Sequence, residues 1–234
     1  IGVEIFEETR VTRLGGRDDE PIELETTGGT VYADRVALCT NVFPSLLKRY
    51  SFHTVPVYDY VLMTEPLSDE QLASIGWEGR EGLADGANQF HYSRLTKDNR
   101  ILWGGYDAVY FAGGRIRHEY EDRMESHRRL ASHFFTTFPQ LAGVRFTHRW
   151  AGVIDTSTRF CAFYGQAHGG RVQYVAGFTG LGVGATHFAA DVIADRFAGR
   201  TTERTELRMV KEVPLPFPPE PAASIGSPPP SALA

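Results

Sequence analysis

The segment YVAGFTGLGVGATHFAADVIADRFAG, residues 174–199, constrains the fold most, because it predicts a buried strand, a glycine-rich turn and a helix in succession. The turn holds four glycines within eight residues, Gly177, Gly180, Gly182 and Gly184. Glycine permits positive φ and lets another group come close to the backbone. The N-terminus of the following helix carries partial positive charge, so the turn favours a ligand with negative charge or an electron-rich oxygen. The alternative is that the glycines only allow tight packing of strand against helix.

The residues after this turn do not fit an independent NAD-binding unit. GLGVGA resembles part of the dinucleotide fingerprint, but that fingerprint requires a further strand after the helix, with an acidic residue at its end. Here the helix is followed by a polar tail rich in proline, EVPLPFPPEPAASIGSPPPSALA. The chain also begins without Met, inside a predicted strand. We therefore expect it to be a piece of a longer protein.

The remaining pattern predicts hairpins with few helices between them. Residues 2–16 are consistent with two short strands, and hairpins are expected around Thr27–Thr30 and at Lys97–Asn99. Ser68 is expected to cap a short helix, and apolar residues at three-to-four spacing predict a long helix over 117–138, ended by Pro139. This mixed order favours an α+β fold, with a mixed or antiparallel sheet flanked by helices.

Composition excludes several classes of protein. The 234 residues are 42% hydrophobic with a net charge of −5, and no basic stripe for nucleic acid, signal peptide or membrane-spanning run is present. Cys39 and Cys161 lie among apolar residues, so we expect buried thiols and a cytoplasmic location. No metal site is predicted from the histidines: His118 and His127, with Glu119, are assigned to a solvated helix face, and packing is favoured for His187. A Ser–His–Asp hydrolase is excluded because no nucleophile elbow is present.

Several stretches, taken in chain order, resemble one family. They are EETRVTRL, DRVALCTNVFPSLL, YDYVLMTEPL, HYSRLTKDNRILWGGYD, HRWAGVIDTS, the glycine turn itself and PFPPEP. Together they resemble the D-amino-acid oxidase (DAO) family of FAD-dependent oxidoreductases, from about Val3 to Pro221. The similarity is greatest to its γ-glutamylputrescine oxidase-like and glycine or sarcosine oxidase-like members. The run after RWAG departs from the family, with Arg159 and Ala162 where an acidic residue and a proline are usual.

The resemblance implies a site for FAD. The residues that it places beside the cofactor are Val11, Thr40, Asn41, Gly177, Phe178, Thr179, Gly180, Leu181, Gly182, Val183 and Gly184. FAD is expected to be non-covalent, because Cys161 does not coincide with the cysteine that tethers flavin in some sarcosine oxidases. The N-terminal Rossmann unit of the family, with its GxGxxG, is missing. Residues 1–50 and 146–210 are expected to be remnant strands and the C-terminal helix of the Rossmann-like FAD-binding domain, with 51–145 as the substrate-binding domain and 211–234 as a proline-rich tail.

The implied reaction is oxidation of the C–N bond of a small amine or amino acid by hydride transfer to flavin. No acid or base is obligatory, and the candidate substrate-binding residues are Tyr60, Tyr92, Arg94 and Trp150. Tyr92 and Arg94 alternate on one strand and so share a face, where Arg94 could bind a carboxylate. A surface arginine and ordinary core aromatics are the alternatives. Arg149 and Trp150 are expected to face opposite ways, which leaves only one of them in the pocket.

Two other roles remain open at this point. The chain could be a non-catalytic binding or scaffold subunit of a flavoenzyme complex, or part of a dehydrogenase that passes electrons to a protein partner. We expect this fragment alone to be inactive, because half of the cofactor site is absent. The sequence does not choose among amine classes or indicate an oligomeric state.

Overall fold

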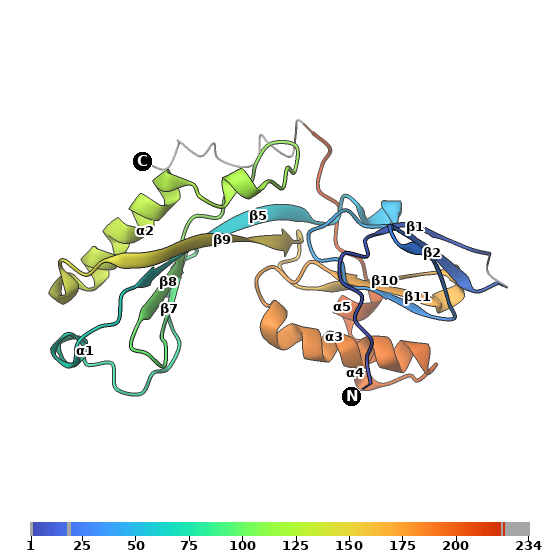
Figure 1. Cartoon of the computed structure of the whole chain (residues 1–234). Helices are drawn as coiled ribbons and strands as arrows, with labels where there is room; N and C mark the ends of the chain where they lie inside the picture. The colour runs from blue at the N-terminus through green and yellow to red at the C-terminus, as the bar shows by residue number, and fades with distance from the viewer. Residues whose placement is uncertain (1, 18–19, 221, 223–234) are drawn as a thin grey trace. The chain divides into compact units, whose positions relative to one another are not determined.

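The computed structural model describes residues 2–17, 20–220 and 222, and these form two compact units. Unit 1 comprises the chain up to Val55 together with Asp155–Pro219, and unit 2 comprises Pro56–Ile154 together with Glu220. Each unit combines sheet and helix (Figure 1), which confirms the predicted α+β class. Most of the tail after Glu220 lies outside the described residues.

Unit 1 contains two small sheets. Strands β1 (Val11–Gly15), β2 (Ile22–Thr26) and β3 (Gly29–Ala33) form an antiparallel meander, and the predicted hairpin turns between Thr26 and Gly29. The second sheet has the order β10–β11–β4, from β10 (Phe163–Ala167), β11 (Val172–Ala176) and β4 (Val36–Leu38). Strand β10 pairs with β11 antiparallel, whereas β4 pairs with β11 parallel.

The second sheet of unit 1 is buried on both faces. Helix α3 (Gly182–Phe197) packs its Val192 and Ile193 against Tyr164 and Val175 on one face, and α5 (Arg208–Lys211) joins this cluster through Val210. On the other face a second apolar cluster joins the two sheets and the 3₁₀ turn η1 (Lys48–Tyr50); its buried members are Ile22, Val36, Leu38, Tyr50, Phe163, Val172, Tyr174 and Ala176. A further 3₁₀ turn, η4 (His168–Gly170), connects β10 to β11.

Unit 2 is built on a five-stranded sheet with the order β6–β7–β8–β5–β9. Its strands are β5 (Val55–Thr64), β6 (Leu83–Ala84), β7 (His91–Leu95), β8 (Ile101–Gly105) and β9 (Phe146–Thr156). The predicted hairpin is confirmed as β7 and β8, which pair antiparallel from Leu95↔Ile101 to His91↔Gly105. Strand β9 forms one edge of the sheet.

One face of this sheet carries the core of unit 2 (Figure 1). Helix α2 (Met124–Thr137) packs Leu130 and Phe134 onto Tyr60 and Trp103, and the indole Nε1 of Trp103 donates to the carbonyl of Leu130 at 3.1 Å. The 3₁₀ turns η2 (His118–Tyr120) and η3 (Pro139–Leu141) flank the helix. Helix α1 (Asp69–Ile75) begins as predicted at Ser68, whose side chain forms a capping box with Gln71.

Three expectations about these elements were wrong. Only β1 forms in the first segment, because Val3, Ile5 and Phe6 are more than 70% exposed and have no sheet to join. Helix α2 begins at Met124, later than predicted, after an extended Arg123. His127 is 3% exposed instead of solvated, because it shares the inner face of α2 with Leu130 and Phe134 at i, i+3 and i+7.

The C-terminal end of α3 is fastened by a buried carboxylate. Asp195 is 1% exposed and accepts hydrogen bonds from Arg204 Nε at 2.7 Å, Thr202 Oγ1 at 2.8 Å and Arg200 Nε at 2.9 Å. These donors link α3 to α4 (Glu203–Glu206) and hold the pKa of Asp195 far below its usual range, with the hydrogen bond from Arg204 as the largest cause. The carboxylate is therefore stabilised in its charged form by folding.

We predict that Asp195→Asn lowers the melting temperature at pH 7 and that its effect fades in acid. A carboxyl group whose pKa is depressed in the folded state stabilises that state above the unfolded pKa of about 4, and this contribution disappears as the pH falls toward the folded pKa. Thermal denaturation followed by circular dichroism at pH 7 and pH 3 measures the difference. Asp34→Asn, at an exposed residue, is the matched control. A difference between Asp195→Asn and wild type that does not change with pH would contradict this assignment.

Candidate functional site

The glycine turn between β11 and α3 is held by a buried carboxyl group. The backbone N–H of Gly177 donates to Asp155 Oδ2 at 2.5 Å, and the N–H of Thr179 donates to the carbonyl oxygen of Asp155 at 3.1 Å. Asp155 is 3% exposed, and burial raises the pKa of its carboxyl group while the N–H groups of the turn act in the opposite direction. The last residues of β9 thus determine the path of the turn.

The physical reason for glycine differs among the four positions of the turn. Gly177 has φ +76°, and a Cβ there would lie 2.8 Å from the Cβ of Ser157 and 3.1 Å from the ring of Phe163. Gly180 has φ +82°, a conformation that side chains disfavour. At Gly182, by contrast, a Cβ would meet only Phe178 at 4.0 Å, and at Gly184 it would meet nothing within 4 Å. Positive φ explains Gly180, and positive φ with close packing explains Gly177, whereas neither reason applies to the absence of a side chain at Gly182 and Gly184.

The N-terminus of α3 is open. Its N-cap residue, Leu181, makes no side-chain capping hydrogen bond, and the exposed fractions of Leu181 and Val183 are 63% and 93%. The helix is 16 residues long, so its first backbone N–H groups present the positive end of a full helix dipole. This end of α3 can receive an anionic or electron-rich group.

The second predicted cofactor segment lies at the same sheet edge as this turn. Because β4 and β11 are parallel, with Leu38 opposite Tyr174, their carboxyl ends leave the sheet side by side. Thr40 and Asn41 follow β4 as Gly177 follows β11. The Oγ1 of Thr40 is buried and has no hydrogen-bond partner in the described chain, and Asn41 adopts φ +51°. Ligands of open α/β sheets bind at this kind of edge.

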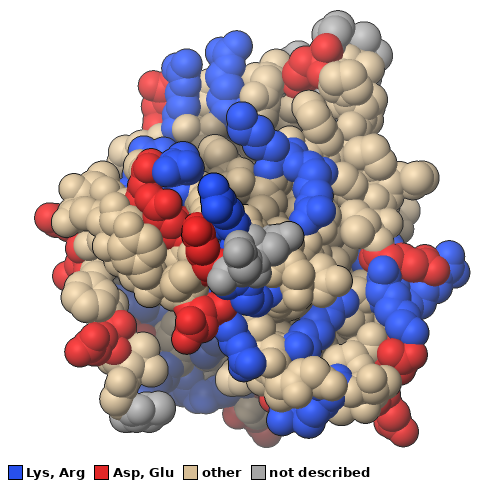
Figure 2. All heavy atoms as spheres, turned by 90° about the vertical axis from the view of Figure 1, so that its right-hand side faces the viewer, with Lys and Arg blue, Asp and Glu red and all other residues tan. Residues whose placement is uncertain are grey.

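The other residues of unit 1 singled out from the sequence are less closely tied to this edge. Val11 is half-buried at the start of β1, opposite Thr26, in the other sheet. The expectation of buried thiols was wrong: Cys39 is exposed and Cys161 is half-buried. Cys39 points outward because it follows the inward-facing Leu38 at the end of β4. Figure 2 shows basic and acidic side chains interspersed on the face of unit 1 that it draws.

In unit 2, Tyr92 crosses a neighbouring strand to reach a carboxyl group. It is paired with Gly104 of β8, and a Cβ at Gly104 would lie 2.5 Å from Cζ of Tyr92, so the ring lies over the glycine. The hydroxyl of Tyr92 donates to Asp59 Oδ2 on β5 at 2.7 Å. Burial raises the pKa of both groups. Asp59 was missed from the sequence, although it is the one charged residue in the strand VPVYDYVLMT.

The other candidate substrate residues of unit 2 lie in different environments. Arg94 is exposed and shares the outer face of the sheet with Tyr92, since Ser93 and Leu95 between and beyond them are buried. Tyr60 has no exposed surface: it belongs to the core and donates its hydroxyl to the carbonyl of Tyr120 at 2.8 Å. The proposed role of Tyr60 as a pocket wall is therefore wrong, because even-numbered residues of β5 face α2.

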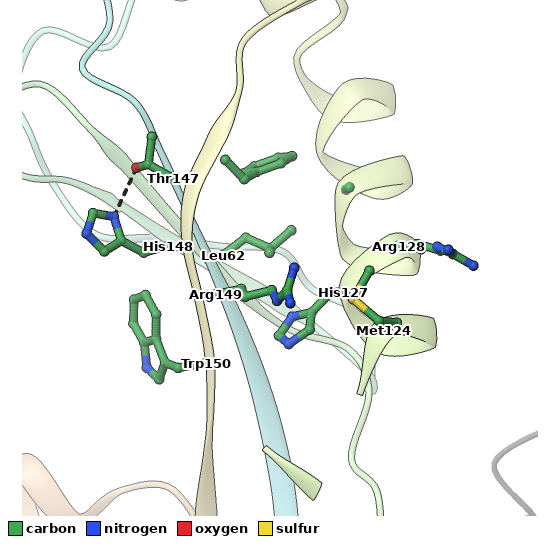
Figure 3. Close-up of a pocket in the computed structure, with 10 residues that line it drawn as sticks. Leu62, Met124, His127, Arg128, Thr147, His148, Arg149 and Trp150 are labelled. Atoms are coloured by element: carbon green, nitrogen blue, oxygen red, sulfur yellow. Dashed lines mark hydrogen bonds between the residues drawn. The ribbon is translucent and has the colours of Figure 1, made fainter. Parts of the chain in front are cut away.

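A hollow of about 720 Å³ lies between β9 and α2 (Figure 3). Both Arg149 and Trp150 line it. Which of the two faces a substrate stays a prediction. Figure 3 shows Arg149 directed toward His127 and Trp150 on the other side of β9, as expected for neighbours on a strand. Arg149 is paired with Asp122, at 2.6 Å from Nε and 2.9 Å from Nη2.

Among residues 2–17, 20–220 and 222, no group of three or more His, Cys, Asp or Glu side chains is arranged to hold a metal ion. No helix in the described part of the chain has the length and apolar character needed to span a bilayer.

Comparison with known proteins agrees with this arrangement. The chain is 28% identical over 222 residues to the γ-glutamylputrescine oxidoreductase of Escherichia coli K12, a match that covers 92% of the chain and 48% of that protein. It is similar in fold to glycine oxidase from Geobacillus kaustophilus, with a TM-score of 0.66, 18% identity and coverage of 85% of the chain and 50% of the other. L-proline dehydrogenase from P. horikoshii gives a TM-score of 0.70, 18% identity and coverage of 86% and 52%.

The chain therefore spans about half the length of the relatives it matches. The model of the family described as FAD dependent oxidoreductase (DAO) matches residues 1–196, most of the chain. With the glycine turn, the parallel strand edge and the sheet of unit 2 in place, the chain belongs to the DAO family of FAD-dependent oxidoreductases.

Proposed function

We propose that this chain forms the substrate-binding part, and a portion of the FAD-binding part, of an enzyme that oxidises the C–N bond of a small amine or amino acid. Unit 1 is assigned to the cofactor and the outer sheet face of unit 2 to the substrate. The three relatives named above support this, since they are a γ-glutamylputrescine oxidoreductase, a glycine oxidase and an L-proline dehydrogenase.

The observation that carries the proposal is the edge formed by β4 and β11. This edge has the open N-terminus of α3, two glycines that no contact among the described residues explains, and the Oγ1 of Thr40, which has no partner among those residues. Backbone donors with partial positive charge suit the electron-rich pyrimidine edge of a flavin. These residues fit FAD, and the set that would line it remains Thr40, Asn41 and Gly177–Gly184, with Val11 assigned to the adenine end. We propose that the binding is non-covalent.

The protein groups hold and orient, and the cofactor supplies the redox step. The chemistry that FAD would supply when bound is removal of a hydride from the carbon that bears the nitrogen, and water would then hydrolyse the resulting imine. Asp155 fixes the turn through Gly177, so the N–H groups of the α3 N-terminus keep their direction. Tyr92 and Arg94 are proposed to position the substrate on the sheet of unit 2, and Trp150 to wall part of its binding site.

We predict that the full-length protein has a flavin absorption spectrum, and that this spectrum bleaches when one class of amine is added without oxygen. Primary amines, secondary amines and amino acids, added separately, identify the class by visible spectroscopy. Oxygen consumption with the active amine then separates an oxidase from a dehydrogenase. A protein that stays colourless after incubation with FAD would contradict the proposal and favour a binding or scaffold role.

We predict that Gly184→Ala weakens FAD binding without destabilising the apoprotein, whereas Gly177→Ala destabilises the apoprotein itself. Gly184→Ala should raise the dissociation constant of FAD at least about 10-fold, which corresponds to about 1.4 kcal/mol, because its Cβ enters the space assigned to the cofactor. The same change should leave the stability of the apoprotein unchanged or raise it by up to about 1 kcal/mol, since alanine favours a helix. The measurements are fluorescence titration with FAD and thermal denaturation of the apoprotein.

Gly177→Ala is the matched comparison. Positive φ and the 2.8 Å approach to Ser157 should destabilise the apoprotein by about 1–3 kcal/mol, whatever the cofactor content. If Gly184→Ala instead lowered apoprotein stability and left FAD affinity unchanged, its glycine would be a packing residue and the assigned cofactor position would be wrong.

A further inference from the structure

Asp59 is a half-buried carboxyl group without a counter-charge. It makes no ion pair with any residue of the described chain, and its hydrogen bonds come from neutral donors, the Tyr92 hydroxyl and the backbone N–H groups of Tyr60 and Gly105. Taking a carboxylate partly out of water without a cation costs free energy. The folded chain thus holds a negative group that a bound cation would neutralise.

The position of Asp59 allows a ligand to reach it from the face of the sheet opposite α2. Val61 and Met63 follow it on the same face of β5, opposite Gly104 and Leu102 of β8. This face is therefore mainly apolar around the carboxyl group. Among the described residues of β5, β7 and β8 on this face, Arg94 is the other charged side chain, and it makes no contact with Asp59.

Tyr92 is held so that it orients this carboxyl group. Its ring lies over Gly104, the only residue type that leaves room there, and its hydroxyl donates to one oxygen of Asp59 at 2.7 Å. The hydroxyl of Tyr92 reaches across β8 to Asp59 on β5, and this hydrogen bond restricts the rotamer of the Asp59 carboxylate. Binding sites commonly hold a charged group in this way, because a fixed group loses less entropy when the ligand arrives.

We propose that Asp59 is a specificity-determining residue that binds a positively charged nitrogen of the substrate, with Tyr92 as its positioning residue. This rests on the function proposed above. The nitrogen at Asp59 is not the one that is oxidised, because contact with a carboxylate favours the protonated amine, whereas transfer of a hydride from the neighbouring carbon requires the neutral amine. The substrate therefore carries a second, non-reacting cationic nitrogen.

The test compares diamines with monoamines of equal length. The full-length protein loaded with FAD is assayed with diaminoalkanes of four to six carbons and with the n-alkylamines in which a methyl group replaces the second nitrogen. Wild type should favour one diamine over its matched monoamine by at least about 10-fold in kcat/KM. Asp59→Asn should reduce this ratio to about 1, mainly by raising KM for the diamine.

Two further variants separate recognition from folding. Asp59→Asn keeps the size and an acceptor for Tyr92, so its melting temperature should equal or exceed that of wild type. Tyr92→Phe should lower the diamine preference by several-fold, in line with the loss of one hydrogen bond. Asp34→Asn, the same chemical change at an exposed residue of unit 1, should leave the preference unaltered.

The outcomes also separate this inference from the proposed function. Calorimetric binding of the same diamines needs no turnover: binding that Asp59→Asn abolishes, in a protein without amine oxidation, would support the cation site and refute the enzyme. Oxidation of amines with a diamine-to-monoamine ratio that Asp59→Asn does not change would refute the cation site and leave the enzyme. A wild type that shows no diamine preference in either assay overturns the inference.

Discussion

The parallel pairing of β4 with β11 is the contact on which the candidate cofactor site depends. It is short, from Val172↔Val36 to Tyr174↔Leu38, and the Val36 N–H extends the ladder by donating to the carbonyl of Arg171 at 2.9 Å. Apolar clusters cover both faces of this sheet, one of them containing Leu38 and Tyr174 and the other containing residues of α3. Two segments separated by more than a hundred residues thereby end at one edge, where Thr40 and the glycine turn lie.

A second constraint is the carboxyl group of Asp155 beneath the turn. Loops are usually held by exposed backbone groups, whereas this one is held from inside the unit, through a side chain at the end of β9. In unit 2, Asp59 is also held by neutral donors, but among the described residues it has no cationic partner. The buried Asp155 is satisfied by the backbone that it shapes, whereas the half-buried Asp59 is the group proposed above to bind a ligand.

The sequence predicted correctly those elements that are determined by residues close together in the chain. The capping box at Ser68, the β7–β8 hairpin and the strand–turn–helix around Gly177 all follow from residues within a few positions of one another. The misses arise from contacts between distant segments. His127 is buried because α2 lies on the sheet. Asp59 is bonded by Tyr92 across β8, and the sequence does not show which strands are neighbours in the sheet. The lone charge in β5 was the available signal for Asp59.

The different roles of the glycines in one turn have a consequence for the history of the family. Gly177 is required by the packing of the chain itself, so selection for folding alone retains it. Gly182 and Gly184 meet no such requirement within the described residues. Under the proposed function, it is the cofactor that keeps side chains away from them. A lineage that gave up its cofactor while keeping its shape would therefore preserve the first glycine and drift at the other two. Substitution at Gly182 and Gly184, compared with substitution at Gly177, would therefore indicate from sequence alone whether a relative still binds its cofactor.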